Sequence, residues 1–156
     1  MLTISAPSAS MSRMGTVKIT DFEGIPCFSI PENSETRNGL PLHGMTISEL
    51  HNGDSDELPP VVWNFKESDH NAPPVLMPTQ CILYGEAPSH TTQRTLKPLE
   101  LLKVYSIYMR ARHDGSSMMG YTGKFCIKPA GSGRTIVQVI PEDSRLGDLR
   151  YGGCKK

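Results

Sequence analysis

The 156-residue chain lacks long apolar runs and an excess of either charge. No stretch approaches the ~18–20 apolar residues that a membrane-spanning helix requires. Sixteen Lys and Arg balance sixteen Asp and Glu. A balanced chain argues against nucleic acid as a partner, because counterion release needs a clustered basic surface. The same balance argues against a polybasic membrane anchor.

Catalytic and metal-binding signatures are also missing. There is no Gly-x-Ser-x-Gly nucleophile elbow, and the cysteines form no Cys-x-x-Cys pair. The histidines lie in polar surroundings without metal-ligand spacing. Residues 131–135 (GSGRT) precede a strand and lack the Gly-Lys-Ser/Thr ending of a phosphate loop, so a hairpin turn is the better interpretation. Residues 113–117 contain the residue types of a hydrolase triad, yet neighbours in one loop rarely converge in space. We therefore expect no enzyme, metal or cofactor.

Glycine and proline are plentiful, with 14 and 13 residues. Their frequency favours many short elements over long helices, and the length fits one domain. About eight short runs alternate like strands. The clearest are residues 16–20 and residues 103–112, where Tyr105, Ile107 and Met109 share a face. We expect an all-β fold, a two-sheet antiparallel sandwich of immunoglobulin-like type, with a small barrel as the alternative.

The predicted organisation is one domain with a lead and a tail. Residues 1–14 lack a basic start and an apolar centre, so we expect a flexible lead or the remnant of a signal peptide. Residues 15–156 form the sandwich domain, which ends in a charged tail. Within it, residues 86–94 are expected to form a polar connection. Residues 96–102 are expected to form a short helical turn or simple packing of leucines.

Four widely spaced cysteines favour one or two disulfides in an oxidising compartment over four buried cytosolic thiols. Four cysteines allow three pairings, and the sequence does not decide among them. The pairing that we favour joins Cys27 to Cys81 and Cys126 to Cys154, the second holding the tail. Trp63, the only tryptophan, is expected in the core against a disulfide, as in immunoglobulin domains.

Two loops carry the residues that we expect to contact a partner. Exposed methionines in the hairpin loop at 112–119 suit an adaptable contact surface, and its flanking arginines suit a carboxylate through a bidentate fork. Acidic residues lie in two loops, 32–35 and 54–57, which suit protein recognition, and the loop at 54–57 is the leading candidate. The alternatives are a folded-back tip and charges that serve only solubility. The predicted contact residues are Arg110, Arg112, His113, Asp114, Met118, Met119, Asp54, Asp56 and Glu57.

Six segments between residues 15 and 140 resemble the periplasmic immunity lipoproteins of bacterial type VI secretion systems. They are 25–30 (IPCFSI), 45–50 (MTISEL), 63–65 (WNF), 81–85 (CILYG), 103–107 (KVYSI) and 124–127 (KFCI). The resemblance implies an antidote in the periplasm of a Gram-negative bacterium. Such a protein binds a cognate type VI effector stoichiometrically and occludes the active cleft of that toxin.

Three further expectations concern the anchor, self-association and a different function. Members of that family carry a lipidated cysteine after a signal peptide, and no cysteine precedes Cys27. We therefore expect either a lost lipid anchor or a soluble member. A net charge of zero permits self-association, and open edge strands permit a homodimer. The alternative function is a secreted or periplasmic sandwich that binds a carbohydrate or small ligand, with Trp63 and Tyr84 exposed as a stacking platform.

Overall fold

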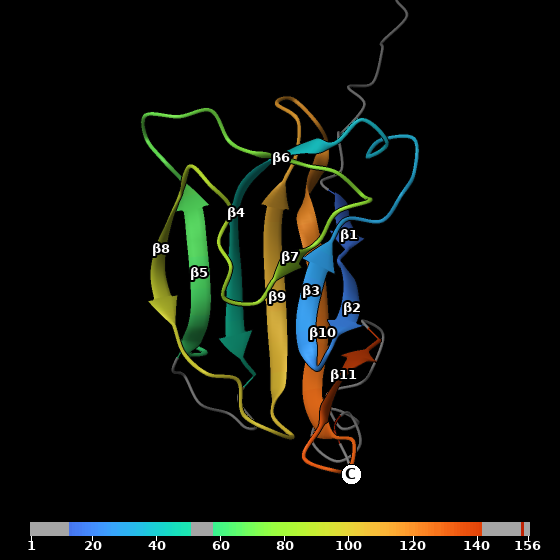
Figure 1. Cartoon of the computed structure of the whole chain (residues 1–156). Helices are drawn as coiled ribbons and strands as arrows, with labels where there is room; N and C mark the ends of the chain where they lie inside the picture. Colours follow the sequence, from blue (N-terminus) through green and yellow to red (C-terminus); the bar gives the residue numbers. More distant parts are fainter. Residues whose placement is uncertain (1–12, 51–57, 142–153, 155–156) are drawn as a thin grey trace, which may run out of the picture.

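The computed structural model describes residues 13–50, 58–141 and 154. These residues form two packed sheets and no helix (Figure 1). The predicted all-β, two-sheet sandwich is therefore confirmed, although the described residues form eleven strands in place of the expected eight or so. Its strands are β1 (Arg13–Thr16), β2 (Lys18–Phe22), β3 (Ile25–Ser29), β4 (Leu40–Glu49), β5 (Val61–Glu67), β6 (Val75–Leu76), β7 (Ile82–Leu83), β8 (Thr91–Leu96), β9 (Val104–Ala111), β10 (Met118–Pro129) and β11 (Thr135–Ile140).

The larger sheet has eight strands. Six follow the order β1-β10-β9-β4-β5-β8, while β11 pairs with β10 and β6 pairs with β4. Its pairings are antiparallel except that of β1, which runs parallel to β10. β8 ends the sheet, because in the described part of the chain only β5 pairs with it.

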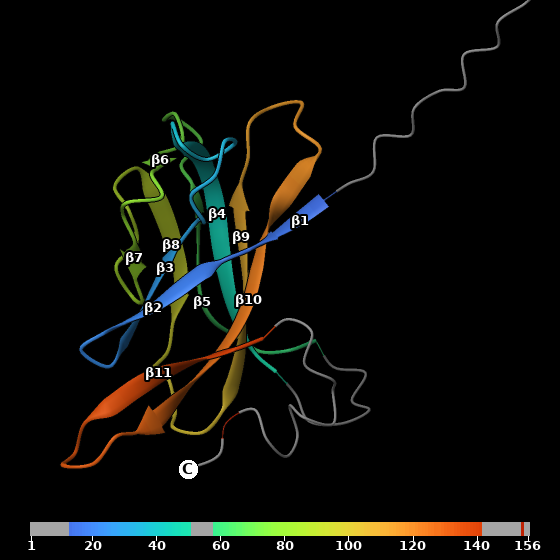
Figure 2. The same cartoon turned by 90° about the vertical axis from the view of Figure 1, so that its right-hand side faces the viewer.

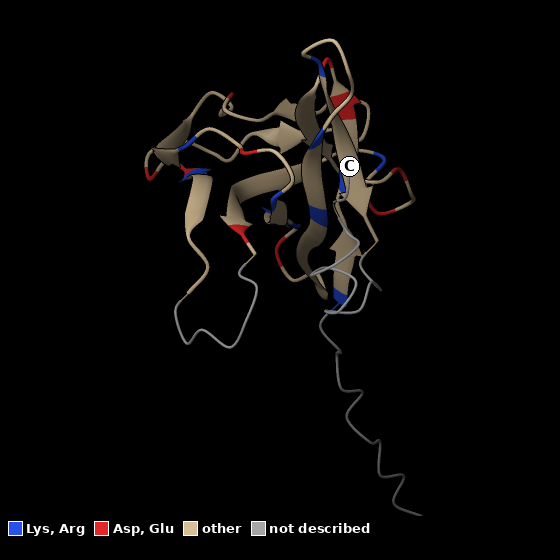
Figure 3. Cartoon of the chain, turned by 90° about the horizontal axis from the view of Figure 1, so that it is seen from below, with Lys and Arg blue, Asp and Glu red and all other residues tan. Residues whose placement is uncertain are grey.

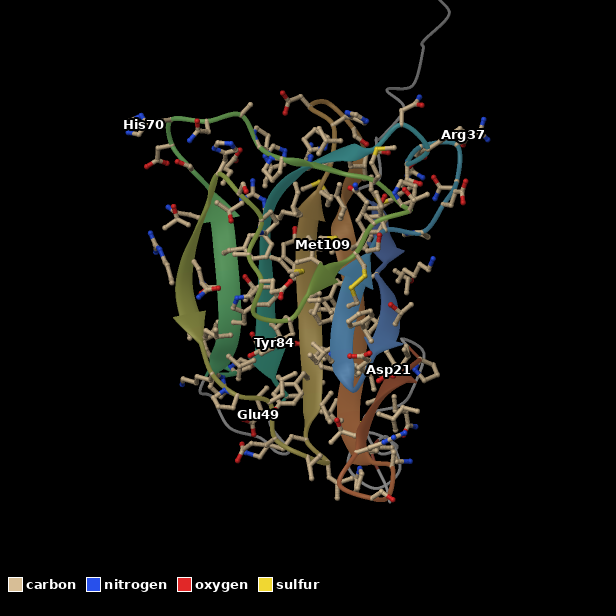
Figure 4. The ribbon with its side chains drawn as sticks, in the orientation of Figure 1. Asp21, Arg37, Glu49, His70, Tyr84 and Met109 are labelled. Atoms are coloured by element: carbon tan, nitrogen blue, oxygen red, sulfur yellow. A yellow bond between two sulfur atoms is a disulfide. The ribbon has the colours of Figure 1, made fainter. Side chains whose placement is uncertain are left out.

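The smaller sheet, in the order β2-β3-β7, covers one face of the larger sheet beside β9 and β10 (Figures 1 and 2). The chain changes sheets at Val17, which lies between β1 and β2 and is buried. An oxygen of Asp21 accepts a hydrogen bond from the amide of Val137 at 2.9 Å, which ties β2 to β11 (Figure 4).

The core lies between the two sheets and is built by period-2 alternation. Met109, at the centre of the larger sheet, is fully buried (Figure 4). The rings of Phe28 and Phe125 meet across the layers, with centroids 5.4 Å apart. The two buried polar residues of the described ranges, Ser29 and Thr36, are hydrogen-bonded, as burial demands: their hydroxyls donate to the carbonyl oxygens of Gln80 and Pro31.

Both predicted disulfides are present, Cys27–Cys81 and Cys126–Cys154. The first lies within the layer of the smaller sheet, because Cys81 directly precedes β7 and Cys27 belongs to β3. Disulfides indicate an oxidising environment, extracytoplasmic or secreted. No described segment forms a helix long and apolar enough to cross a membrane.

Trp63 is a core residue, as predicted, with none of its surface exposed. Its ring contacts Phe65 and Tyr84, at centroid distances of 5.3 and 5.1 Å. Its indole nitrogen donates to the side-chain oxygen of Gln93 in β8 at 2.9 Å.

Two local predictions were wrong, and the helical turn, one of the two alternatives given for residues 96–102, is excluded. Arg13 and Met14, assigned to the flexible lead, belong to β1, where the edge of β10 pairs with their backbone. Residues 86–94, assigned to a connection, contain the start of β8. Residues 96–102 form no helical turn: Leu96 closes β8, and Leu101 forms an isolated bridge with Ile127.

Candidate functional site

The loop between β9 and β10 borders a hollow of about 270 Å³ at one end of the sandwich. We call it the hairpin-end hollow. Its lining comes from β1, from the loop before β4 and its first residue, from the β9–β10 loop, and from β10. The lining residues are Arg13, Glu35, Leu40, Arg112, His113, Ser116, Met118 and Tyr121.

An ion pair joins two of these segments. Arg13 Nη2 lies 2.9 Å from Glu35 Oε1, with both side chains about half exposed. Arg13 also binds the β9–β10 loop, because its Nε donates to Ser117 Oγ at 3.1 Å. Arg13 thus links β1, the loop before β4 and the hairpin loop.

Glu35 is held in place by its own loop. The side-chain oxygen of Asn33 accepts hydrogen bonds from the amides of Glu35 and Thr36, at 2.9 and 3.1 Å. This is an Asx turn, in which a short polar side chain replaces a backbone carbonyl. The buried hydroxyl of Thr36 closes the same loop on Pro31. The carboxylate therefore projects from an ordered loop.

Arg112 organises the hairpin loop on the other side of the hollow. Its Nη2 donates to the carbonyl oxygen of Ser116 at 3.2 Å, and its Nη1 donates to the sulfur of Met119 at 3.4 Å. Both acceptors are neutral, and no described carboxylate forms an ion pair with Arg112. Each Nη carries two hydrogens, so the guanidinium keeps donors and charge for an outside carboxylate.

Tyr121 lines the hollow from inside the sandwich. Burial raises the pKa of its phenol, Glu35 adds to the increase, and Arg13 opposes it. The ring lies against β1 at Gly15, where a Cβ would come within 2.5 Å of it. Glycine at this position therefore allows β1 to pack closely on the ring.

The structure brings together only part of the predicted contact set. Arg112, His113 and Met118 line the hollow, and Met119 touches Arg112. Asp114 is exposed in the same loop. Met118 packs against the core, so it follows the folded-back alternative, whereas Met119 is 38% exposed. The predicted residues Asp54, Asp56 and Glu57 lie outside the described residues.

Arg110 is exposed and lies apart from the hairpin-end hollow, on the outer face of the larger sheet. Its predicted contact with a carboxylate of a partner stays a prediction.

Sequence reasoning gave no role to Arg13 or Tyr121, and it noted Glu35 only as part of an acidic loop. Arg13 was assigned to the flexible lead, and Tyr121 belongs to a strand that was recognised without a role. The signal for Glu35 is Asn33, because Asx turns are typical of an ordered loop. Their convergence depends on pairings between distant segments, which no local pattern reveals.

No group of three or more His, Cys, Asp or Glu within the described ranges is placed to hold a metal ion. The stacking platform of the carbohydrate alternative is not formed, because Trp63 is fully buried beneath Tyr84 and Phe65. The hairpin-end hollow thus presents the positioned cation of Arg112, the exposed thioether of Met119 and loops with hydrogen-bonding groups.

Comparison with models of protein families, with curated proteins and with solved structures found no match to this chain. The function is therefore argued from the site.

Proposed function

We propose that this protein is an immunity protein that binds a cognate secreted bacterial toxin and blocks it by stoichiometric occlusion. The toxin is a type VI effector, and both proteins meet in the periplasm of a Gram-negative bacterium. The observation that supports this proposal is the environment of Arg112 at the hairpin end of the sandwich. Neutral acceptors hold its guanidinium in place, and no described carboxylate forms an ion pair with it.

Three features of the hairpin end favour its binding in the active cleft of a toxin. Hydrogen bonds already order the loops around the hollow, so little entropy is lost when they bind. A cation held in a fixed orientation suits a carboxylate of a toxin's active cleft through charge-assisted hydrogen bonds. The half-exposed Met119 next to it supplies an adaptable apolar contact.

The first experiment is capture of the partner. The oxidised protein is immobilised, secreted and periplasmic extract of its source organism is passed over it, and retained proteins are identified by mass spectrometry. We expect one stoichiometric partner with submicromolar affinity. Failure to retain any partner, while secretion is demonstrably active, would reject the proposal.

The second experiment locates the interface. Arg112→Ala combined with Met119→Ala should weaken binding of the captured toxin by about tenfold or more, because anchors of this kind dominate interface energy. Arg134→Ala is the matched control, since this exposed arginine lies in the β10–β11 turn at the opposite end of the molecule (Figure 1). Binding is measured by calorimetry, and thermal melting verifies folding. Unchanged affinity of the double variant would remove the hairpin end from the interface.

A further inference from the structure

A second hollow, of about 140 Å³, lies on the outer face of the larger sheet. Its charged lining is entirely basic. The lining residues are His43, Gly44, Met45, Thr46, Asn64, Phe65, Lys66, Thr92, Arg94, Tyr108 and Arg110, from β4, β5, β8 and β9. We call this surface the cationic face. It is turned away from the smaller sheet (Figure 2).

The cations of this face are largely uncompensated. Lys66, Arg94 and Arg110 are exposed, and none takes part in the ion pairs among the described residues. His43 is the exception, since its Nδ1 lies 3.0 Å from Glu67 Oε1. Elsewhere acidic and basic residues are interspersed around the molecule (Figure 3). Three exposed cations with Glu67 as the neighbouring acid leave an excess of positive charge, and the resulting potential attracts an anionic group.

The cationic face borders a free sheet edge. β8 pairs with β5 on one side only, and no described strand pairs with its other side. It contains no proline, and Arg94 is its one charged residue. A free edge presents backbone donors and acceptors, and an added peptide strand satisfies them through main-chain hydrogen bonds. A charge on the edge disfavours like-charged strands, so Arg94 selects an acidic strand.

We propose that the cationic face and the free edge of β8 form a docking surface for an extended acidic segment of a partner protein. The backbone of that segment extends the sheet at β8. Alternate side chains of a strand point to the same face, so acidic residues at every second position lie beside Arg94 on β8, with Lys66 one strand further in on β5.

The two features together specify a polypeptide. A phosphate ion or a nucleic acid matches the cations but not the edge of a sheet, and a net charge of zero does not favour nucleic acid. The surface differs from the hairpin-end hollow, so this inference stands apart from the proposed toxin inhibition. Its test accordingly needs no toxin.

The test uses the oxidised full-length protein and two nine-residue peptides, one alternating Glu with Thr and one alternating Lys with Thr. Binding is followed by NMR at low salt. We expect the Glu–Thr peptide to shift the amides of β8 and the side-chain signals of Arg94 and Lys66, and to slow amide exchange in β8. Salt should weaken this binding.

Variants assign the effect to the named residues. Arg94→Gln and Lys66→Gln should each weaken binding of the Glu–Thr peptide by about three- to fivefold, as for exposed charge pairs, while the control Arg134→Gln binds like the wild type. Four results would each overturn the proposal: no shifts at millimolar peptide, equal binding of the Lys–Thr peptide, wild-type affinity of both variants, or the same shifts from inorganic phosphate or a short DNA strand.

Discussion

At the scale of one residue, Tyr84 attaches the segment that follows β7 to the core. Its hydroxyl donates to the carbonyl oxygens of Lys97 and Val62, at 2.5 and 3.3 Å, while its ring packs on Trp63. Burial raises the pKa of Tyr84 to about 12, with Tyr105 adding to the increase. The neutral phenol is therefore the form that the folded protein stabilises.

Tyr84→Phe should lower the free energy of unfolding by about 1 kcal/mol, the usual net contribution of such a hydrogen bond. A phenol that ionises near pH 10 when unfolded and near pH 12 when folded stabilises fully below pH 10 and loses that contribution as the pH rises to 12. The variant should therefore show a shallower loss of stability over that range. Urea unfolding at pH 7, 10 and 11.5 measures both effects.

Tyr108→Phe is the matched control, because that exposed hydroxyl also donates to a carbonyl oxygen, of Met119, at 3.3 Å. Tyr108→Phe should change the free energy of unfolding by at most ~0.5 kcal/mol, as for surface changes. Equal stability and equal pH dependence of Tyr84→Phe and the wild type would contradict the assigned role of Tyr84.

At the scale of elements, one side-chain hydrogen bond reinforces the backbone pairing of β8 with β5. Gln93 accepts the indole hydrogen bond of the fully buried Trp63, while Thr92 and Arg94 line the cationic face. One face of this strand thus attaches it to the core, whereas the other face forms part of the exposed cationic face.

Gln93→Ala should destabilise the protein by about 1–3 kcal/mol, because it leaves a buried donor without a partner. Hydrogen exchange of the β8 amides should accelerate, and the emission of Trp63 should change. Thr92→Ala, on the other face of the same strand, should leave both unchanged. Denaturant unfolding and exchange mass spectrometry test the pair, and equal behaviour of the two variants would contradict the attachment role.

Alternation in the sequence predicted the strands that bury one face. Residues 103–112 show this clearly, because Tyr105, Ile107 and Met109 are buried as expected. β8 (TTQRTL) escaped prediction because an exposed edge strand needs no apolar alternation. The parallel pairing of β1 also escaped, since a period of two reveals the face of a strand but not its neighbour. The hairpin-end hollow was foreseen only at Arg112, His113 and Met118, which are local in sequence.

At the scale of the whole molecule, the two disulfides supply stability that a reducing compartment would remove. Their cysteines are separated by 54 and 28 residues. Loop-closure entropy predicts losses of about 4 and 3.5 kcal/mol when each is removed. We expect Cys27→Ala with Cys81→Ala, and Cys126→Ala with Cys154→Ala, each to lower the free energy of unfolding by about 2–5 kcal/mol. Urea unfolding measures this, and wild-type stability of either double variant would contradict it.

Neither disulfide joins one sheet to the other. The Cys27–Cys81 bond stays within the smaller layer, and Cys126 lies in the larger sheet. The layers are joined by chain crossings such as Val17 and by side-chain contacts such as Phe28 against Phe125. The resistance of the molecule to a pulling force therefore depends on the direction of that force. A load along a loop closed by a disulfide meets a covalent bond. A load that separates the layers first meets packing and a few hydrogen bonds, such as that between Val137 and Asp21, so the oxidised chain yields first in that direction.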